Sequence, residues 1–271
     1  MSAKSLIVVP ARFGSTRFPQ KPLHDIAGRT LVSRVAKTAA RAAAATGADY
    51  VVATDHEAIA NHCRALSIPV VITPPEAPSG TDRALLAVTA MRVSPDIVVN
   101  LQGDSPFTPA GHVVALIEAA RQGDCDAATP VVALSWDQLD KLRDHKRNEP
   151  FSGTTCVTDA AGRALWFSKT ILPAIRKEDA LRRASPTSPV LKHVGLYAYK
   201  LEALERYVTL SEERYERLEG LEQLRLLEHG LSIQTVRVDA SEYWLGGVDT
   251  PEDARIAEAL IAELGDPFDG P

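Results

Sequence analysis

The first half of the chain alternates short apolar runs with longer stretches of helical pattern. Runs that predict buried strands lie at residues 6–9, 50–54, 69–72, 97–101 and 127–132. Helical patterns lie between them, at residues 31–47, 57–66, 81–91 and 112–120. Strands that are apolar throughout, rather than alternating, are typical of a parallel sheet covered on both faces. We therefore expect an α/β fold, with a Rossmann-like, mostly parallel sheet and helices on both faces.

The second half has a different pattern, which predicts a smaller mixed lobe beyond a boundary near residue 130. A turn at 159–162 between two strand-like pieces predicts a hairpin, and 194–199 returns to strand character. Residues 175–189 are charged and contain Pro and Ser, so we expect a mobile loop there. A last helix should begin at Thr250–Pro251 and end near Leu264. Leucines with helical spacing predict one further apolar helix face, formed by Leu218, Leu221, Leu224 and Leu227.

Composition and charge exclude several classes of protein. The chain has 271 residues, of which 45% are hydrophobic, too many for a disordered protein. No apolar run has the length of a membrane span or of a secretory signal. The net charge of −5 argues against a nucleic-acid partner. Three widely spaced cysteines suggest neither a metal site nor a disulfide framework, so a reduced, cytoplasmic enzyme is expected.

A basic turn directly follows the first predicted strand. Arg12, Arg17 and Lys21 flank Gly14, Ser15 and Thr16, whose backbone N–H groups could face an anion. Such a turn at the carboxyl end of a strand suits a polyphosphate. Neither the Walker A spacing nor the dinucleotide-binding glycine pattern is present. The alternative interpretation is a solvated basic turn.

Two carboxylates are candidates for a magnesium site. Asp104 follows the apolar strand 97–101, at the edge where open α/β sheets bind ligands, and Gly103 would allow a close backbone approach. Asp249 follows Gly246 and Gly247 at the mouth of the last helix. Mg²⁺ usually takes one or two protein carboxylates together with phosphates and water. An ordinary turn residue and a helix cap are the alternatives.

A series of short motifs along the chain resembles one family of enzymes. They are Pro10-Ala-Arg-Phe-Gly-Ser-Thr-Arg-Phe-Pro-Gln-Lys-Pro-Leu23, Ala53-Thr-Asp-His-Glu57, Ser79-Gly-Thr-Asp-Arg83, Val99-Asn-Leu-Gln-Gly-Asp104, Phe167-Ser168, His193-Val-Gly-Leu-Tyr197, Leu221-Glu-Gln-Leu-Arg225 and Gly247-Val-Asp-Thr-Pro-Glu-Asp253. Their order over residues 5–260 resembles the sugar nucleotidyltransferases that make CMP-activated acidic sugars. The 3-deoxy-manno-octulosonate (Kdo) cytidylyltransferases are the most similar of these.

The resemblance implies a reaction and assigns residues to it. CTP and Kdo would give CMP-Kdo and diphosphate with Mg²⁺ as cofactor, in an enzyme that forms a homodimer through residues 131–240. Residues 1–130 would be the nucleotide-binding half, and 241–265 the metal-ligand loop and last helix, all within one α/β domain. CTP would be held by Pro10, Ala11, Arg12, Gly14, Ser15, Thr16, Arg17, Lys21, Ser79, Gly80 and Arg83. Asp104 and Asp249 would bind the metal and, with Arg12 and Lys21, carry catalysis.

The sugar site rests on the resemblance more than on pattern. It implies contacts from Gln102, Lys169, His193, Tyr197, Glu222 and Gln223. By pattern alone, His193 and Tyr197 share one face of a predicted strand, and Glu222 and Gln223 lie on a helix away from its leucine stripe. By pattern alone, a core histidine, a core aromatic residue and a solvated helix face are the favoured explanations of these residues.

Three departures from the family pattern lie on the acceptor side or in segments that flank it. Ser105 replaces a usual Glu, Lys169 replaces a usual Arg, and residues 149–157 lack a usual Lys. Lysine keeps the charge but loses the bidentate guanidinium geometry. A changed acceptor, such as 8-amino-Kdo or a nonulosonate, is therefore one alternative. A catalytically silent nucleotide-binding module is another, and retention of both Asp104 and Asp249 argues against it.

Overall fold

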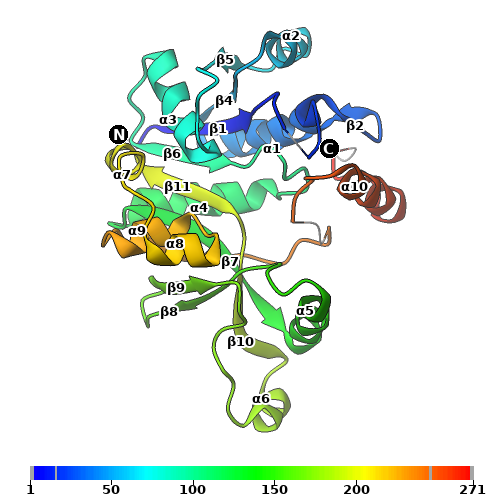
Figure 1. Ribbon diagram of the computed structural model, residues 1–271, viewed down its shortest axis with the longest axis vertical. Coiled ribbons are helices and arrows are strands. Elements are labelled where there is room, and N and C mark those ends of the chain that lie inside the picture. Colours follow the sequence, from blue (N-terminus) through cyan, green and yellow to red (C-terminus); the bar gives the residue numbers. More distant parts are fainter. Residues whose placement is uncertain (1–2, 16, 244–245, 269–271) are drawn as a thin grey trace.

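A computed structural model describes residues 3–15, 17–243 and 246–268, arranged around one large twisted sheet (Figure 1). The sheet contains β1 Ser5–Ala11, β4 Asp49–Thr54, β5 Val70–Ile72, β6 Ile97–Leu101, β7 Ala127–Ser135, β8 Thr155–Thr158, β9 Ala164–Ser168, β10 Thr187–His193, β11 Leu196–Lys200 and β12 Ile233–Arg237. A separate small pair is formed by β2 Asp25–Ile26 and β3 Arg29–Thr30.

Helices connect and cover the strands. They are α1 Leu31–Thr46, α2 Glu57–Ala65, α3 Gly80–Met91, α4 Ala110–Gln122, α5 Trp136–Asn148, α6 Glu178–Ala184, α7 Leu201–Tyr207, α8 Arg214–Glu219, α9 Gln223–Glu228 and α10 Pro251–Leu264, with a short 3-10 helix at Lys21–Leu23. Among the described helices, none combines the length and the apolar character that crossing a bilayer requires.

The order of the strands divides the sheet into a parallel part and a mixed part. It runs β5-β4-β1-β6-β11-β7-β10-β8-β9, with β12 paired to β7. The four strands β5, β4, β1 and β6 are parallel, as predicted, and β11 then joins β6 antiparallel. From β11 onward the sheet is mixed, and the predicted boundary near residue 130 lies inside β7, which pairs with β10, β11 and β12.

Both faces of the sheet are covered, which confirms the predicted layers. Leu6 and Val8 of β1 pack with α3, α7 and α9 on one face. Ile7 and Val9 pack with α1, α2 and α4 on the other. Alternate residues of one strand thus enter two different cores, so a strand in this position must be apolar throughout.

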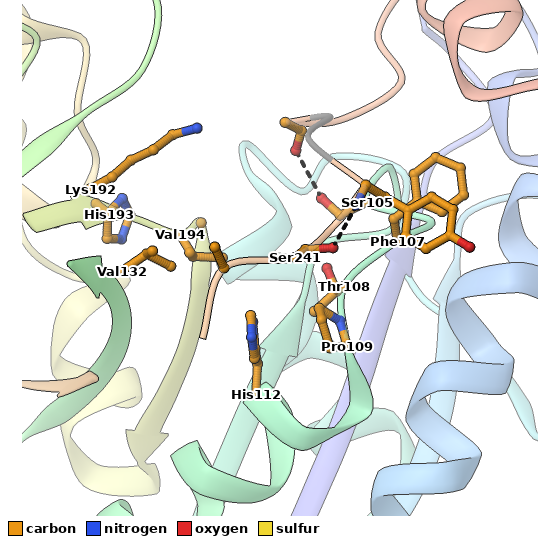
Figure 2. Close-up of a pocket in the computed structure, with 14 residues that line it drawn as sticks. Ser105, Phe107, Thr108, Pro109, His112, Val132, Lys192, His193, Val194 and Ser241 are labelled. Atoms are coloured by element: carbon orange, nitrogen blue, oxygen red, sulfur yellow. Dashed lines mark hydrogen bonds between the residues drawn. The ribbon is translucent and has the colours of Figure 1, made fainter. Parts of the chain in front are cut away.

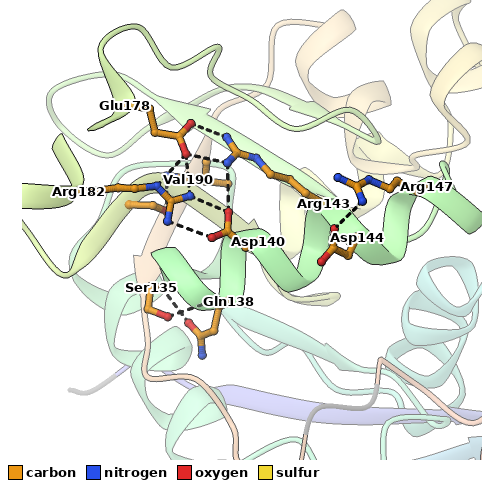
Figure 3. Close-up of polar contacts among 10 residues, drawn as sticks. Ser135, Gln138, Asp140, Arg143, Asp144, Arg147, Glu178, Arg182 and Val190 are labelled. Atoms are coloured by element: carbon orange, nitrogen blue, oxygen red, sulfur yellow. Dashed lines mark hydrogen bonds and ion pairs between the residues drawn. The ribbon is translucent and has the colours of Figure 1, made fainter. Parts of the chain in front are cut away.

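Two predictions about the second half are wrong. Residues 175–189 contain α6, whose Arg182 and Glu178 form an ion-pair cluster with Asp140 and Arg143 of α5 (Figure 3). The charged residues for which a mobile loop is predicted therefore hold α6 against α5. The leucine pattern over residues 218–227 is divided between α8 and α9 by a left-handed Gly220, and Leu218 is 69% exposed. A glycine in this conformation ends a helix.

The last helix is confirmed in detail. Thr250 caps α10 by accepting a hydrogen bond from the Asp253 backbone N–H, and the Asp253 side chain accepts one from the Thr250 backbone N–H. Pro251 occupies the first turn of the helix. A backbone N–H at this position has no partner within the helix, so proline loses no hydrogen bond there. This reciprocal cap fixes the direction in which the chain enters the helix, and so the position of the preceding Asp249.

Candidate active site

A cleft of about 330 Å³ lies at the carboxyl ends of β1 and β6, where the sheet changes from parallel to mixed. Ligands in open α/β sheets bind at such an edge. The cleft is lined by Pro10, Ala11, Arg12, Arg17, Lys21, Pro22, Ala77, Pro78, Ser79, Gly80, Arg83, Gln102, Gly103, Asp104, Glu222 and Asp249. The predicted basic turn, both predicted carboxylates and the start of α3 therefore surround one cavity.

The two carboxylates meet at one ammonium group. Lys21 Nζ lies 3.1 Å from Asp104 Oδ2 and 3.0 Å from Asp249 Oδ1. Arg17 Nη2 lies 3.2 Å from the same Asp249 oxygen. A backbone hydrogen bond of 2.8 Å, from Val248 N to the Asp104 carbonyl, joins the two loops that carry the acids.

The surrounding charges affect the ionisation of Asp249. Burial alone would raise its pKa, but the hydrogen bond and charge of Lys21, together with the charge of Arg17, hold the pKa below its usual value. Asp249 is therefore a carboxylate at neutral pH, the form that binds cations.

Gly103 permits the close contact between the two strands that form the cleft floor. A Cβ at this position would lie 2.0 Å from the carbonyl oxygen of Pro10. The approach of a ligand to the Gly103 backbone stays a prediction, and in the structure this glycine allows β1 and β6 to converge. Gln102 and Asp104 on either side of it are thereby held beside the basic turn.

The basic turn is anchored by a residue that the pattern did not single out. Asp55, directly after β4, accepts a hydrogen bond of 2.9 Å from Phe13 N and one of 3.1 Å from Arg83 Nη2. Its carboxylate therefore connects the turn to α3. The rule that identified Asp104, an acid at the carboxyl end of a strand, would have identified Asp55 as well.

The start of α3 contributes in two ways. Ser79 caps the helix, since its hydroxyl accepts hydrogen bonds from Thr81 N and Asp82 N. Arg83 is only 3% exposed, and besides Asp55 its guanidinium binds Thr73 Oγ1 at 2.6 Å. Both residues line the cleft, but these polar groups also hold the local structure together.

Some predicted nucleotide residues lie elsewhere. Gly14 and Ser15 do not line the cleft as the described residues define it. Ser15 Oγ instead accepts a hydrogen bond of 3.3 Å from Phe18 N within the turn. Thr16 lies outside the described residues.

The predicted sugar residues divide between two places. Gln102 and Glu222 line the cleft. His193 lines a neighbouring cavity of about 140 Å³, together with Ser105 and Lys192 (Figure 2). Ser105 is the residue next to Asp104, so the second cavity lies close to the first.

His193 and Tyr197 are in contact, but not for the predicted reason. They belong to different strands, β10 and β11, rather than to one face of a single strand. His193 Nε2 lies 3.0 Å from the Tyr197 hydroxyl and 2.9 Å from Thr129 Oγ1. Burial lowers the pKa of His193 to about 3, and the charge of Lys169 acts in the same direction, so the ring is neutral.

Two further predictions need correction or qualification. Gln223 is only 5% exposed, so it does not lie on a solvated helix face. Lys169 does not line the cleft in the described part of the chain; its backbone N–H donates to Glu219 and its carbonyl accepts from Lys146. Burial lowers the pKa of the Lys169 ammonium, with the Glu219 charge acting against this shift.

Comparison with known proteins identifies the family. Residues 6–233 match the cytidylyltransferase family model. The chain is 41% identical over 263 residues to the 3-deoxy-manno-octulosonate cytidylyltransferase of Maricaulis maris, covering 96% of this chain and 98% of that one. It is 39% identical to the enzyme of the same name from Acidobacterium capsulatum, with coverage of 97% and 98%.

A solved structure agrees with this assignment. CMP:2-keto-3-deoxy-manno-octonic acid synthetase, determined in complex with CTP, superimposes with a TM-score of 0.82 and 32% identity. The match covers 97% of this chain and 100% of that one. The chain therefore belongs to the cytidylyltransferase family, among the 3-deoxy-manno-octulosonate cytidylyltransferases.

Proposed function

We propose that the protein transfers CMP from CTP to the anomeric hydroxyl of Kdo, giving CMP-Kdo and diphosphate. The single observation that carries this proposal is the cleft in which Arg12, Arg17 and Lys21 lie beside two carboxylates. Relatives that match over 98% of their own length are named 3-deoxy-manno-octulosonate cytidylyltransferases, and this name supports CTP as the nucleotide and Kdo as the sugar.

The reaction needs positioning and charge neutralisation more than covalent catalysis. The anomeric oxygen forms a bond to the α-phosphorus of CTP. The bond from that phosphorus to the bridging oxygen breaks, diphosphate leaves with the electron pair, and the hydroxyl proton passes to solvent. Arg12, Arg17 and Lys21 would bind the triphosphate oxygens and offset the charge on the leaving group.

Asp104 and Asp249 would hold Mg²⁺. Their oxygens are the hard donors that this ion prefers, and they already converge on one positive charge, that of Lys21. Within the described residues, no group of three or more His, Cys, Asp or Glu side chains could hold a metal ion. Two carboxylates that leave the remaining positions to phosphate and water are consistent with magnesium. When bound, the ion would neutralise charge on the transferring phosphate.

For the acceptor, Gln102 and Glu222 would contact the sugar from the cleft, and His193 would do so from the neighbouring cavity. Lys169 as partner of the sugar carboxylate stays a prediction, as do the contacts of Tyr197 and Gln223.

Diphosphate release tests the proposal. The purified protein is given CTP, Mg²⁺ and, in separate reactions, Kdo, 8-amino-Kdo and a nonulosonate. Release that is fastest with Kdo supports the proposed acceptor. A clear preference for another ulosonate would reassign the sugar while keeping the reaction. CTP binding by calorimetry, without diphosphate release on any acceptor, would identify a silent nucleotide-binding module.

We further propose a homodimer that forms through the second lobe. Tyr215 and Leu218 of α8 are 45% and 69% exposed, and Tyr215 packs edge-on against Trp166 of β9. Sedimentation equilibrium of the wild type and of Leu218→Glu tests this. We expect a dimeric wild type and a monomeric variant, and a monomeric wild type would refute the proposal.

The cytoplasmic location also stays a proposal, supported by three cysteines that are all free thiols.

A further inference from the structure

Thr81 occupies an unusual position between the two sides of the cleft. It is the second residue of α3, directly after Ser79 and Gly80, which line the cleft. Its own side chain turns inward, because the residue is only 2% exposed. The hydroxyl lies 3.3 Å from Glu222 Oε2 and 3.1 Å from Asn100 Nδ2.

The chemistry of these groups fixes the direction of both hydrogen bonds. A carboxylate can only accept, so the single hydroxyl proton of Thr81 is donated to Glu222. The same oxygen must then accept from the amide of Asn100, a fully buried residue in β6. Asn100, Thr81 and Glu222 thus form a relay from the sheet, through α3, to the residue that precedes α9.

Glu222 depends on this relay for its position. It belongs to the short connection between α8 and α9, where the helical pattern is interrupted. The other hydrogen bond to the same oxygen comes from the Tyr207 hydroxyl and is longer, at 3.5 Å. Burial raises the pKa of Glu222, while the Thr81 hydrogen bond and the Arg225 charge act against this shift. Thr81 therefore both orients the carboxylate and favours its charged form.

We propose that Thr81 is a positioning residue for the acceptor sugar, holding Glu222 in the cleft through the Asn100–Thr81–Glu222 relay. This inference rests on the proposed function, in which Glu222 contacts the sugar. Because Thr81 does not line the cleft itself, its loss affects acceptor binding through Glu222. The nucleotide contacts at the start of α3 depend on the Ser79 cap, which does not use the Thr81 side chain.

The experiment compares Thr81→Val, which removes the hydroxyl at nearly constant shape, with Thr81→Ser, which retains it. A lost hydrogen bond to a charged group is expected to raise the KM for Kdo about tenfold. The KM for CTP should stay within about twofold, and serine should restore most of the loss. Thr89→Val is the matched control, because Thr89 lies on the same helix and its exposed hydroxyl donates to the backbone carbonyl of Leu85. Combining Thr81→Val with Glu222→Gln should add little to the effect of Glu222→Gln alone.

Binding measurements separate this inference from the proposed function. Kdo binding is measured by calorimetry in the presence of a non-hydrolysable CTP analogue, for the wild type, Thr81→Val and Thr81→Ala. Weakened Kdo binding with unchanged binding of the analogue supports the relay even if turnover is absent. Equal losses for both ligands, no loss for either, additive losses in the double variant, or failure of serine to restore binding would overturn it. A wild type that binds the analogue but not Kdo would refute the acceptor assignment and the relay's role together. Thr81→Ala provides the same comparison if the valine variant does not fold.

Discussion

Asp104 and Asp249 share one counter-ion, the ammonium group of Lys21, which lies 3.1 Å from the first carboxylate and 3.0 Å from the second. The two acids are far apart in the sequence, one after β6 and the other before α10. Two carboxylates this close need a positive charge between them. Lysine provides it here, and a divalent cation with the triphosphate would provide it during the proposed reaction.

Removing one of these charges should impair catalysis. We expect Asp249→Asn to lower kcat on the order of 100-fold, similar to the loss of one electrostatic contact to a transition state. The Mg²⁺ concentration needed for half-maximal rate should also rise. Asp144→Asn, which changes an exposed acid of α5, is the matched control and should leave both quantities unchanged. An Asp249 variant with normal magnesium dependence would remove this residue from the metal site.

Replacing the shared lysine should change both CTP binding and the ionisation of Asp249. In Lys21→Met we expect a higher KM for CTP, and a higher pKa for Asp249, because a hydrogen bond and a charge that lower this pKa are gone. NMR titration of the carboxyl group measures the pKa, and Lys141→Met, at an exposed position of α5, is the control. In the wild type, the depressed pKa contributes stability above the unfolded value of about 3.8, and this contribution is lost as pH falls through the folded pKa. An unchanged Asp249 titration in Lys21→Met would contradict the shared-ion arrangement.

A methyl group at Gly103 should disrupt the cleft floor. The added Cβ would meet the Pro10 carbonyl at 2.0 Å, so β1 and β6 must separate. We expect Gly103→Ala to lose about 1–3 kcal/mol of stability and most of its activity. Gly111→Ala is the opposite control, since a Cβ there meets nothing within 4 Å and the residue lies in α4. Alanine in a helix should gain about 0.5–1 kcal/mol, and thermal melts of both variants measure the difference. Equal melting temperatures for the two variants would contradict the proposed clash.

The lowered pKa of His193 should make the free energy of unfolding depend on pH. The unfolded chain binds a proton as pH falls below about 6.5, whereas burial keeps the folded histidine neutral until about pH 3. The contribution of His193 to stability is therefore lost as pH drops through this window. Urea unfolding between pH 4 and 7 should show a shallower dependence for His193→Gln than for the wild type. His145→Gln, at an exposed position, should behave as the wild type. Parallel curves for the wild type and His193→Gln would contradict the lowered pKa, because they would show that the folded ring binds a proton as readily as the unfolded one.

Much of the cleft around the basic turn could be predicted because its signals are local. Apolar runs gave β1, β4, β5 and β6, and the rule that ligands bind at the carboxyl ends of strands selected Asp104 and the basic turn. The residues proposed for the acceptor were harder to place, because they come from short elements whose pairing depends on distant partners. His193 and Tyr197 show this, since they touch across two strands that the pattern had merged into one. Gln223 shows it as well. Its burial results from the packing of α9 against the core, which the periodicity of the sequence did not indicate.

The amino-acid sequence by itself determined the alternation of strands and helices, the cap of the last helix, the basic turn and the order of motifs that identifies the family. These features depend on interactions between residues close together in the chain, which propensity and periodicity reveal. Only the tertiary structure decided which distant groups meet: Lys21 with both acids, Gly103 with Pro10, and Thr81 with Glu222. Those contacts depend on the register of the sheet and the packing of helices on it, which no local pattern specifies.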